Sequence, residues 1–158
     1  MSSRPARERH EHTVAVTRVF DAPRERVFAA WTRAEHLAHW FGPKGFDVHS
    51  CVADPRPGGL FRLCMRSPEG EEYWVRGEYR EVVAPARLVV HCFADDAKGI
   101  QRLDEVITVT LADEGARTRL KLHAAAGGAG AEAAAMLRGM DQGWGETLDR
   151  LHERSKSA

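Results

Sequence analysis

The chain has 158 residues, of which 43% are hydrophobic and 29% charged, as in ordinary globular proteins. This length is typical of a single domain and is sufficient to bury a hydrophobic core. The 23 Lys and Arg residues balance 23 Asp and Glu residues, so the formal net charge is zero. That balance excludes the broad cationic surface of a nucleic-acid-binding protein. We therefore expect one domain that does not bind nucleic acid.

The termini and the cysteines bear on the cellular location of the protein. Residues 1–12 are polar and basic and lack the apolar stretch of a signal peptide, and no later segment has the length and hydropathy of a membrane span. The three cysteines have no CxxC spacing, and their odd number argues against a disulfide framework. We expect a cytoplasmic protein with reduced thiols, a disordered tail at 1–12 and a short tail at 155–158.

The N-terminal elements are predicted to be a strand and two short helices. Residues 13–20 alternate apolar and polar side chains, which is typical of a half-buried strand. Asp21 can cap a helix whose first turn contains Pro23. Residues 32–35 form a capping-box pattern for a second helix, which should end near Trp40, before a Gly-Pro pair.

From Phe46 onward the pattern predicts about six strands separated by turn residues at 55–59, 67–70, 84–85, 95–99 and 113–115. Within 60–66 the residues alternate between an apolar and a mostly polar face, and the strands that follow repeat this alternation. A sheet with one apolar face and one solvent-exposed face is typically antiparallel. The apolar series includes Phe61, Leu63, Met65, Ile107, Val109, Leu111, Leu120 and Leu122.

The C-terminal region predicts a long helix. We expect residues 124–130, rich in Ala and Gly, to be a flexible connection, followed by a helix to about Arg154. Five apolar residues recur every three or four positions and form one stripe: Leu137, Met140, Trp144, Leu148 and Leu151. The apolar face of the sheet is the surface large enough to cover that stripe, which gives an α+β fold.

The motifs and their order resemble a known family. They are Val19-Phe20-Asp21-Ala22-Pro23, Val27-Phe28-Ala29-Ala30-Trp31, Leu37-Ala38-His39-Trp40-Phe41-Gly42-Pro43, Pro57-Gly58-Gly59 with Phe61-Arg62, Gly77-Glu78-Tyr79, Arg87-Leu88-Val89, and Gly143-Trp144 before Leu148-Asp149-Arg150-Leu151. In this order and spacing, over about residues 13–154, the chain resembles the bacterial branch of the START-like (SRPBCC) superfamily that is named after the C-terminal domain of the activator of Hsp90 ATPase.

The resemblance implies a helix-grip fold, in which a bent antiparallel sheet of six to seven strands wraps round a long C-terminal helix and leaves an elongated cavity between them. It does not imply one activity. Relatives include lipid carriers, plant hormone receptors, polyketide aromatase and cyclase domains, a self-sacrificing resistance protein and the co-chaperone domain itself, so function must be argued from the site.

The candidate ligand-binding residues are large apolar side chains that the alternation and the helical stripe direct inward. Each alone is more often a core residue, but aromatic and methionine side chains together form a surface that accepts flat or flexible apolar molecules. The set is Trp40, Phe41, Phe61, Leu63, Met65, Tyr79, Val90, Met136, Met140 and Trp144.

The sequence offers little support for catalysis, a metal or a cofactor. Strand parity gives Arg76, Glu78 and His91 as acid–base candidates, although outward or paired positions are more common for such residues. His36 and His39 lie three apart on a predicted helix, where a solvated surface is the more common outcome than a metal site. No nucleophile elbow or phosphate-binding glycine loop is present, so we expect no catalytic residue, metal or cofactor.

Three functions remain as hypotheses. The first is the binding or sequestration of an apolar small molecule. The second is an enzyme of the polyketide cyclase or aromatase kind, in which one or two polar groups in the cavity move protons. The third, an Hsp90 co-chaperone, is the least favoured, because the sequence lacks the N-terminal domain of the eukaryotic activator. The sequence does not decide between a monomer and a homodimer.

Overall fold

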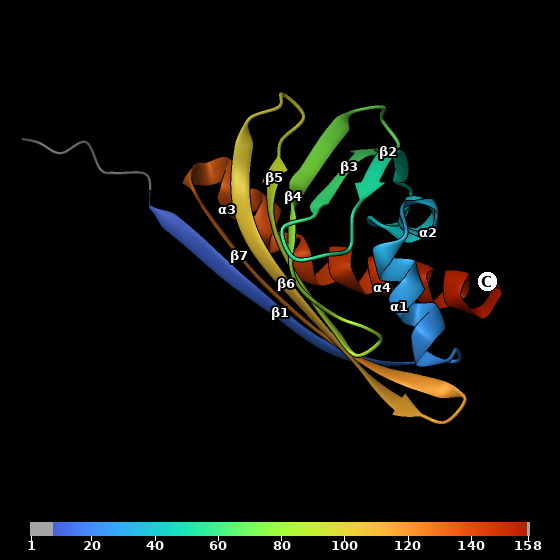
Figure 1. The fold of residues 1–158 in the computed structure, drawn as a ribbon. Helices are drawn as coiled ribbons and strands as arrows, with labels where there is room; N and C mark the ends of the chain where they lie inside the picture. The colour runs from blue at the N-terminus through green and yellow to red at the C-terminus, as the bar shows by residue number, and fades with distance from the viewer. Residues whose placement is uncertain (1–7, 158) are drawn as a thin grey trace, which may run out of the picture.

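A computed structural model describes residues 8–157. One antiparallel sheet contains all seven strands, in the order β1-β7-β6-β5-β4-β3-β2. The elements in chain order are β1 (Arg9–Phe20), α1 (Arg24–Thr32), α2 (Ala34–Trp40), β2 (Asp47–Ala53), β3 (Leu60–Arg66), β4 (Glu72–Val83), β5 (Arg87–Asp95), β6 (Gln101–Glu114), β7 (Arg117–Ala129), α3 (Gly130–Arg138) and α4 (Met140–Ser157). This arrangement confirms the predicted α+β helix-grip fold (Figure 1).

Strand alternation divides the sheet into an inner and an outer face. On β6 the buried residues Leu103, Ile107, Val109 and Leu111 share one face, because successive side chains of a strand point to opposite sides. Residues in register on the neighbouring strands, such as Val90 on β5, continue this face. The inner face therefore forms the hydrophobic core.

The helices cover the inner face. All five residues of the predicted C-terminal stripe are buried, with Leu148 and Leu151 fully so. Helices α1 and α2 lie beside the C-terminal half of α4, while α3 lies at the other end, against β1 and β7 (Figure 1). The sheet and α4 thus enclose a long interface, whose two ends are covered by different helices.

The folded domain extends further at both chain ends than the sequence predicted. Strand β1 begins at Arg9, so residues 9–12 are paired with β7 and are not part of a tail, while residues 1–7 lie outside the described residues. The Arg9 guanidinium holds Asp104 through two hydrogen bonds of 3.0 and 3.1 Å, an ion pair that nothing local in the sequence reveals. At the other end α4 continues to Ser157, and Ser155 is only 1% exposed, so the predicted tail is wrong for 155–157, while residue 158 lies outside the described residues.

The predicted flexible connection at 124–130 is also wrong, since β7 runs through it to Ala129. The small residues serve close packing, because a side chain at Gly128 would collide with the Arg102 backbone carbonyl and the methyl of Ala133. The C-terminal helix is divided at Gly139 into α3 and α4. The composition of the segment therefore indicated a tight approach between β7 and α3, not mobility.

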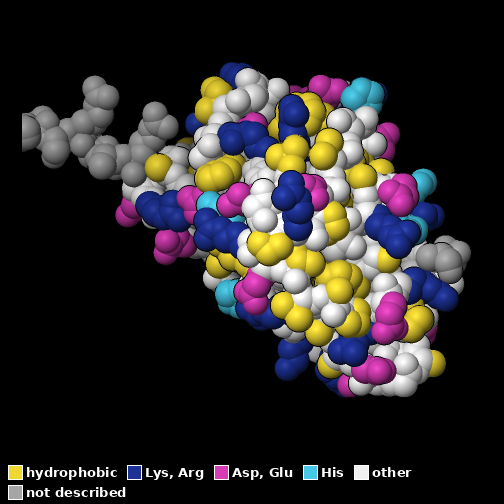
Figure 2. Space-filling view, viewed as in Figure 1, with side chains coloured by type: hydrophobic (Ala, Val, Ile, Leu, Met, Phe, Trp, Pro, Cys, Tyr) yellow, Lys and Arg dark blue, Asp and Glu magenta, His cyan; other side chains and the backbone are white. Residues whose placement is uncertain are grey.

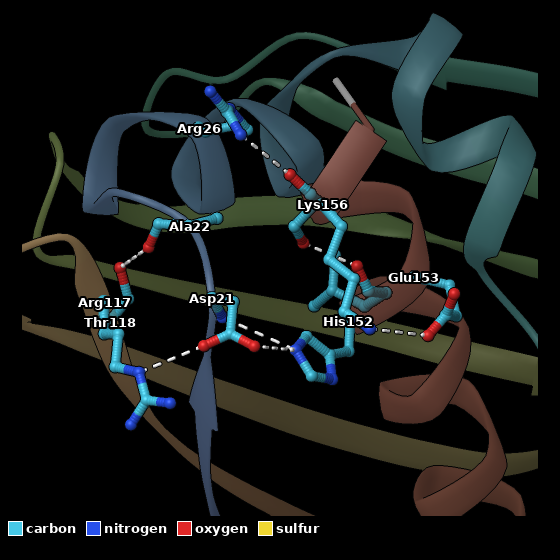
Figure 3. A network of polar contacts seen from close by, with 10 residues as sticks. Asp21, Ala22, Arg26, Arg117, Thr118, His152, Glu153 and Lys156 are labelled. Carbon is cyan, nitrogen blue, oxygen red and sulfur yellow. Dashed lines mark hydrogen bonds and ion pairs between the residues drawn. The ribbon is translucent and has the colours of Figure 1, made fainter.

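The two short helices form as predicted, but neither uses the predicted cap. Asp21 accepts a hydrogen bond of 3.0 Å from Arg117 and lies 3.7 Å from His152, so it joins the end of β1 to β7 and α4 (Figure 3). Thr32 donates to the Phe28 carbonyl within α1 and does not cap α2. Asp21 is therefore engaged by tertiary contacts that a local pattern does not contain, whereas Thr32 bonds within its own helix.

The surface carries both charge signs. In the view of Figure 2, basic and acidic side chains are interspersed over the face shown, which agrees with the balanced composition. Among the helices of residues 8–157, none has the length and hydropathy needed to cross a membrane.

Candidate ligand-binding cavity

A cavity of about 350 Å³ lies between the sheet and the two C-terminal helices. Its walls are the loop 41–46, the end of β3, the start of β4, the end of β5, the start of β6, α3 and the first turns of α4. The lining is predominantly apolar, and the volume is within the range of small-molecule sites.

Five of the ten predicted site residues line this cavity: Phe41, Met65, Met136, Met140 and Trp144. Phe41 and Trp144 meet edge to face, with their ring centroids 6.0 Å apart. The two methionines of α3 and α4 lie on either side of Gly139, which also lines the cavity. Of the helical stripe, Met140 and Trp144 therefore lie at the wall of this cavity.

The other five predicted residues do not line the cavity. Trp40, Phe61, Leu63, Tyr79 and Val90 are fully buried among other side chains. The Trp40 indole donates to the Ala30 carbonyl at 2.9 Å, and the Tyr79 hydroxyl donates to the Trp31 carbonyl at 3.0 Å. These side chains fill the end of the interface that α1 and α2 cover, because those helices bring Trp31 and Leu37 into the same space.

Sequence reasoning missed several lining residues, of which Glu105 matters most. Glu105 has the same parity on β6 as Leu103, Ile107 and Val109, and so belongs to the inner face. A carboxylate within an apolar alternating series was the signal that could have found it. Phe46, Tyr73 and Leu103 also line the cavity and were not among the predicted residues.

The Glu105 carboxylate lies in an apolar environment. Its register neighbours on the two adjoining strands are Cys92 and Ala126. Its hydrogen-bond donor among the described residues is the Trp144 indole, whose Nε1 lies 3.3 Å from Oε2. Burial raises the pKa of Glu105 to about 7, and the indole hydrogen bond only partly offsets this effect. Near neutral pH the carboxyl group is therefore divided between its neutral and charged forms.

The other carboxylate of the cavity is already paired. Asp95 is 7% exposed and accepts two hydrogen bonds from Arg76, at 2.9 and 3.2 Å. In this bidentate geometry each carboxylate oxygen accepts one hydrogen bond. Glu105 is consequently the acidic side chain of the lining that has no basic partner among the described residues.

The acid–base candidates chosen from the sequence lie on the outer face. Val75 and Tyr79 point inward, so Arg76 and Glu78 point outward, and His91 is paired with Glu78 in register. His91 Nδ1 lies 2.8 Å from the Arg80 guanidinium. These three residues therefore do not reach the cavity.

The loop 41–46 is fixed to α4 by a partly buried cation. Arg150 donates from Nη1 to the carbonyls of Gly42 and Pro43, at 2.9 and 3.1 Å, and from Nη2 to the His39 carbonyl at 3.4 Å. Gly42 has a φ of 106°, a left-handed conformation that glycine adopts without strain. Arg150 thus positions one wall of the cavity, although it does not line it.

A second cleft, of about 620 Å³, lies on the far side of this loop. It is lined by charged and polar side chains of both signs: His39, Lys44, Glu146, Asp149, Arg150, Glu153 and Arg154. Charged side chains remain hydrated, and this lining offers little apolar surface to a ligand. The smaller cavity is therefore the better candidate site.

The histidines and cysteines of the described residues show neither a metal site nor an activated thiol. His36 lies 3.3 Å from the Arg154 guanidinium, which does not favour a metal ion beside it. Residues 8–157 contain no cluster of three or more potential metal ligands. The three cysteines are free thiols, with Cys64 and Cys92 buried. Burial raises the pKa of Cys51 to about 11, which makes its thiol a weak nucleophile at neutral pH.

The bent sheet, the C-terminal helix and the cavity between them define a START-like, or SRPBCC, helix-grip protein, a class in which hydrophobic ligands are commonly bound. A model of the family described as "Activator of Hsp90 ATPase homolog 1-like protein" matches residues 21–156. The chain therefore belongs to this family.

Solved structures agree with this assignment. A crystal structure of a protein from Chromobacterium violaceum is 28% identical, with a TM-score of 0.79 and coverage of 91% of this chain and 96% of that one. A protein from Nitrosomonas europaea is 25% identical, with a TM-score of 0.74 and coverage of 92% and 94%. The AHSA1 protein of Silicibacter pomeroyi shares the fold at 22% identity, with a TM-score of 0.74 and coverage of 90% and 96%. A search of curated proteins found no match.

Proposed function

We propose that this protein binds an apolar, aromatic-containing small molecule reversibly in the cavity between the sheet and α3 and α4. The observation that supports it is a preformed space of about 350 Å³ with an apolar lining, beside a core that is otherwise filled. Enclosing an apolar ligand there removes its surface from water, which is the main driving force for such binding.

Affinity in the micromolar range is expected, about 8 kcal/mol, because apolar burial supplies most of the binding energy and few polar anchors are available. Trp144 and Trp74 line the cavity, whereas Trp31 and Trp40 are fully buried in the core. Emission from the two lining tryptophans should therefore respond saturably when a panel of flavonoids, polycyclic aromatics and alkyl compounds is titrated.

A cavity-filling variant tests the location of the site. Met140→Trp places a larger side chain at a position that lines the cavity and is 9% exposed, and it should weaken binding at least tenfold. Val83→Trp adds the same side chain at an exposed position, 52% accessible on β4, and should leave binding unchanged. Calorimetric titration, with circular dichroism to check folding, separates the two. Equal binding by both variants would place the ligand elsewhere.

Proton-transfer catalysis is the second candidate, and Glu105 is the observation that favours it. A carboxyl group whose pKa is raised to about 7 inside a cavity can both accept and donate protons at neutral pH. An enzyme of the cyclase or aromatase kind would convert the bound compound. Mass spectrometry of each binding compound after prolonged incubation distinguishes the two functions, since a binding protein returns its ligand unchanged.

The family description also raises the co-chaperone function. Our proposal places the function of this chain in its cavity, and it predicts no stimulation of a bacterial Hsp90 ATPase at equimolar amounts. A reproducible and saturable rise in ATP hydrolysis would favour the co-chaperone function instead.

A further inference from the structure

The cavity lining is electrostatically one-sided. Among the described residues that line it there are two carboxylates, Asp95 and Glu105, and no Lys, Arg or His. Asp95 is neutralised from outside the cavity by Arg76, through two hydrogen bonds. Glu105 retains only the neutral Trp144 indole as a donor. The inner wall therefore contains one carboxylate without a counter-charge.

Such a carboxylate has a large desolvation cost and can regain stability from a cationic partner. In a water-poor site an opposite charge is attracted more strongly than in bulk water. A protonated amine can donate to the Glu105 oxygen that the indole does not contact, and a cation is also favoured by neighbouring aromatic faces. The rings of Phe41, Tyr73 and Trp144 line the same space. A carboxylate ligand, in contrast, would meet a like charge.

We propose that Glu105 makes the cavity selective for apolar molecules that carry a protonated amine. This inference rests on the proposed binding function and names the class of ligand that the site prefers. The hydrocarbon part of the ligand packs against Met136, Met140 and the aromatic rings, while its ammonium group pairs with Glu105. Neutral analogues bind more weakly, and anionic analogues such as fatty acids bind most weakly.

A matched series of three probes tests the selectivity in the unmodified protein. Naphthylethylamine, naphthylethanol and naphthylacetic acid share one aromatic skeleton and differ in the charge of the end group. By calorimetric titration at about pH 7.5, the amine should bind about tenfold or more tightly than the alcohol, and the alcohol more tightly than the acid. Equal affinity for the amine and the alcohol would overturn the inference and leave the proposed binding function standing. Absence of binding by all three would overturn both.

Two variants assign the selectivity to one side chain. Glu105→Gln keeps the size of the side chain and an acceptor for Trp144, but it removes the charge. It should weaken amine binding about tenfold, leave alcohol binding within about threefold and improve binding of the acid. Glu78→Gln removes an exposed carboxylate from the outer face of β4 and should change none of the three affinities. An amine preference that survives in Glu105→Gln would contradict our assignment.

Proton release provides a readout that does not depend on any variant. When the amine pairs with Glu105 below about pH 7, the carboxyl group must lose its proton, whereas the alcohol requires no such loss. Calorimetry at pH 6.5 in two buffers of different ionisation enthalpy should report proton release for the amine alone. The same result for both probes would contradict the ion pair.

Other titratable groups near Glu105 are already engaged or are weak acids. Asp95 is held by Arg76, and the Tyr73 hydroxyl donates to Glu71. Cys92 lies opposite Glu105, and burial raises the pKa of its thiol well above the usual value. His12 lies in the same cross-strand row beyond Ala126, and its ring is 3.2 Å from Asp141, outside the cavity lining. Loss of proton release in Glu105→Gln would exclude His12 as its source, whereas unchanged release would overturn our assignment.

Discussion

The two ends of the interface between the sheet and the C-terminal helices differ in how completely they are filled. Under α1 and α2, the aromatic rings of Trp31, Trp40 and Tyr79 leave no exposed surface. Under α3 and the start of α4, side chains of similar type surround a space of about 350 Å³. The residue types do not explain the difference. At the filled end, α1 and α2 both add side chains to the core beside α4, whereas at the hollow end the loop 41–46 and α3 border the space.

The largest expected effect compares core truncations at the two ends. Leu148→Ala at the filled end should lower the free energy of unfolding by about 3–5 kcal/mol, because it removes a fully buried side chain and leaves a void. Met140→Ala borders the existing cavity and should cost about 1–2 kcal/mol, since the lost contacts are fewer. Urea denaturation of the two variants measures the difference. Equal losses would mean that the two ends are packed alike in solution.

The second effect concerns Glu105 and depends on pH. Its folded pKa of about 7 lies above the ordinary value of 4.5, so between these values the folded protein binds more protons than the unfolded chain. The free energy of unfolding should therefore fall as pH rises from about 4.5 to 7. Glu105→Gln removes this penalty and should stabilise the protein at about pH 8 by up to about 3 kcal/mol, with little change near pH 4.

Chemical denaturation of the variant and the unmodified protein across this pH range measures the effect. Glu78→Gln is the matched control, because its exposed carboxylate has no comparable burial. A stability difference between Glu105→Gln and the unmodified protein that stays constant with pH would show that water solvates Glu105 fully.

The smallest effect compares the two tyrosines, both on β4. At the filled end the buried Tyr79 hydroxyl donates to the Trp31 carbonyl in the last turn of α1, and Tyr79→Phe should cost about 1–2 kcal/mol because that carbonyl loses its partner. At the hollow end the Tyr73 hydroxyl donates to the exposed Glu71, and Tyr73→Phe should cost less than about 0.5 kcal/mol. Thermal unfolding of both variants is sufficient to rank them. A larger loss for Tyr73→Phe would reverse the comparison.

The fold could be predicted because its signals are periodic. Alternation in the strands and the stripe from Leu137 to Leu151 identify the faces that must meet, and the order of the motifs identifies the family. What failed were local interpretations that tertiary contacts override. Asp21 was assigned to a helix cap but pairs with Arg117 and His152, and the residues of 124–129 were assigned to a flexible segment but form a strand.

The candidate site was predictable only in part. Parity and helical spacing show that Trp40 and Met140 both face inward, but they do not show which of the two meets other side chains and which meets a cavity. That outcome depends on where α1 and α2 end along the interface, which is a property of the assembled fold. Glu105 could have been found by extending the alternation of β6 toward its start, because parity treats an inward-facing glutamate in the same way as a leucine.

The attachment of the loop 41–46 to α4 has a consequence for how this protein responds to acidity. Arg150 holds the loop by donating to backbone carbonyls, and a guanidinium keeps its charge throughout the physiological range. Carbonyl oxygens do not titrate there either, so these bonds persist while Glu105 gains or loses its proton. The position of this wall and the charge of Glu105 are thus controlled independently. If the cavity binds amines through Glu105 as we propose, a shift of one pH unit would change its ligand preference without loosening the bonds that hold this wall.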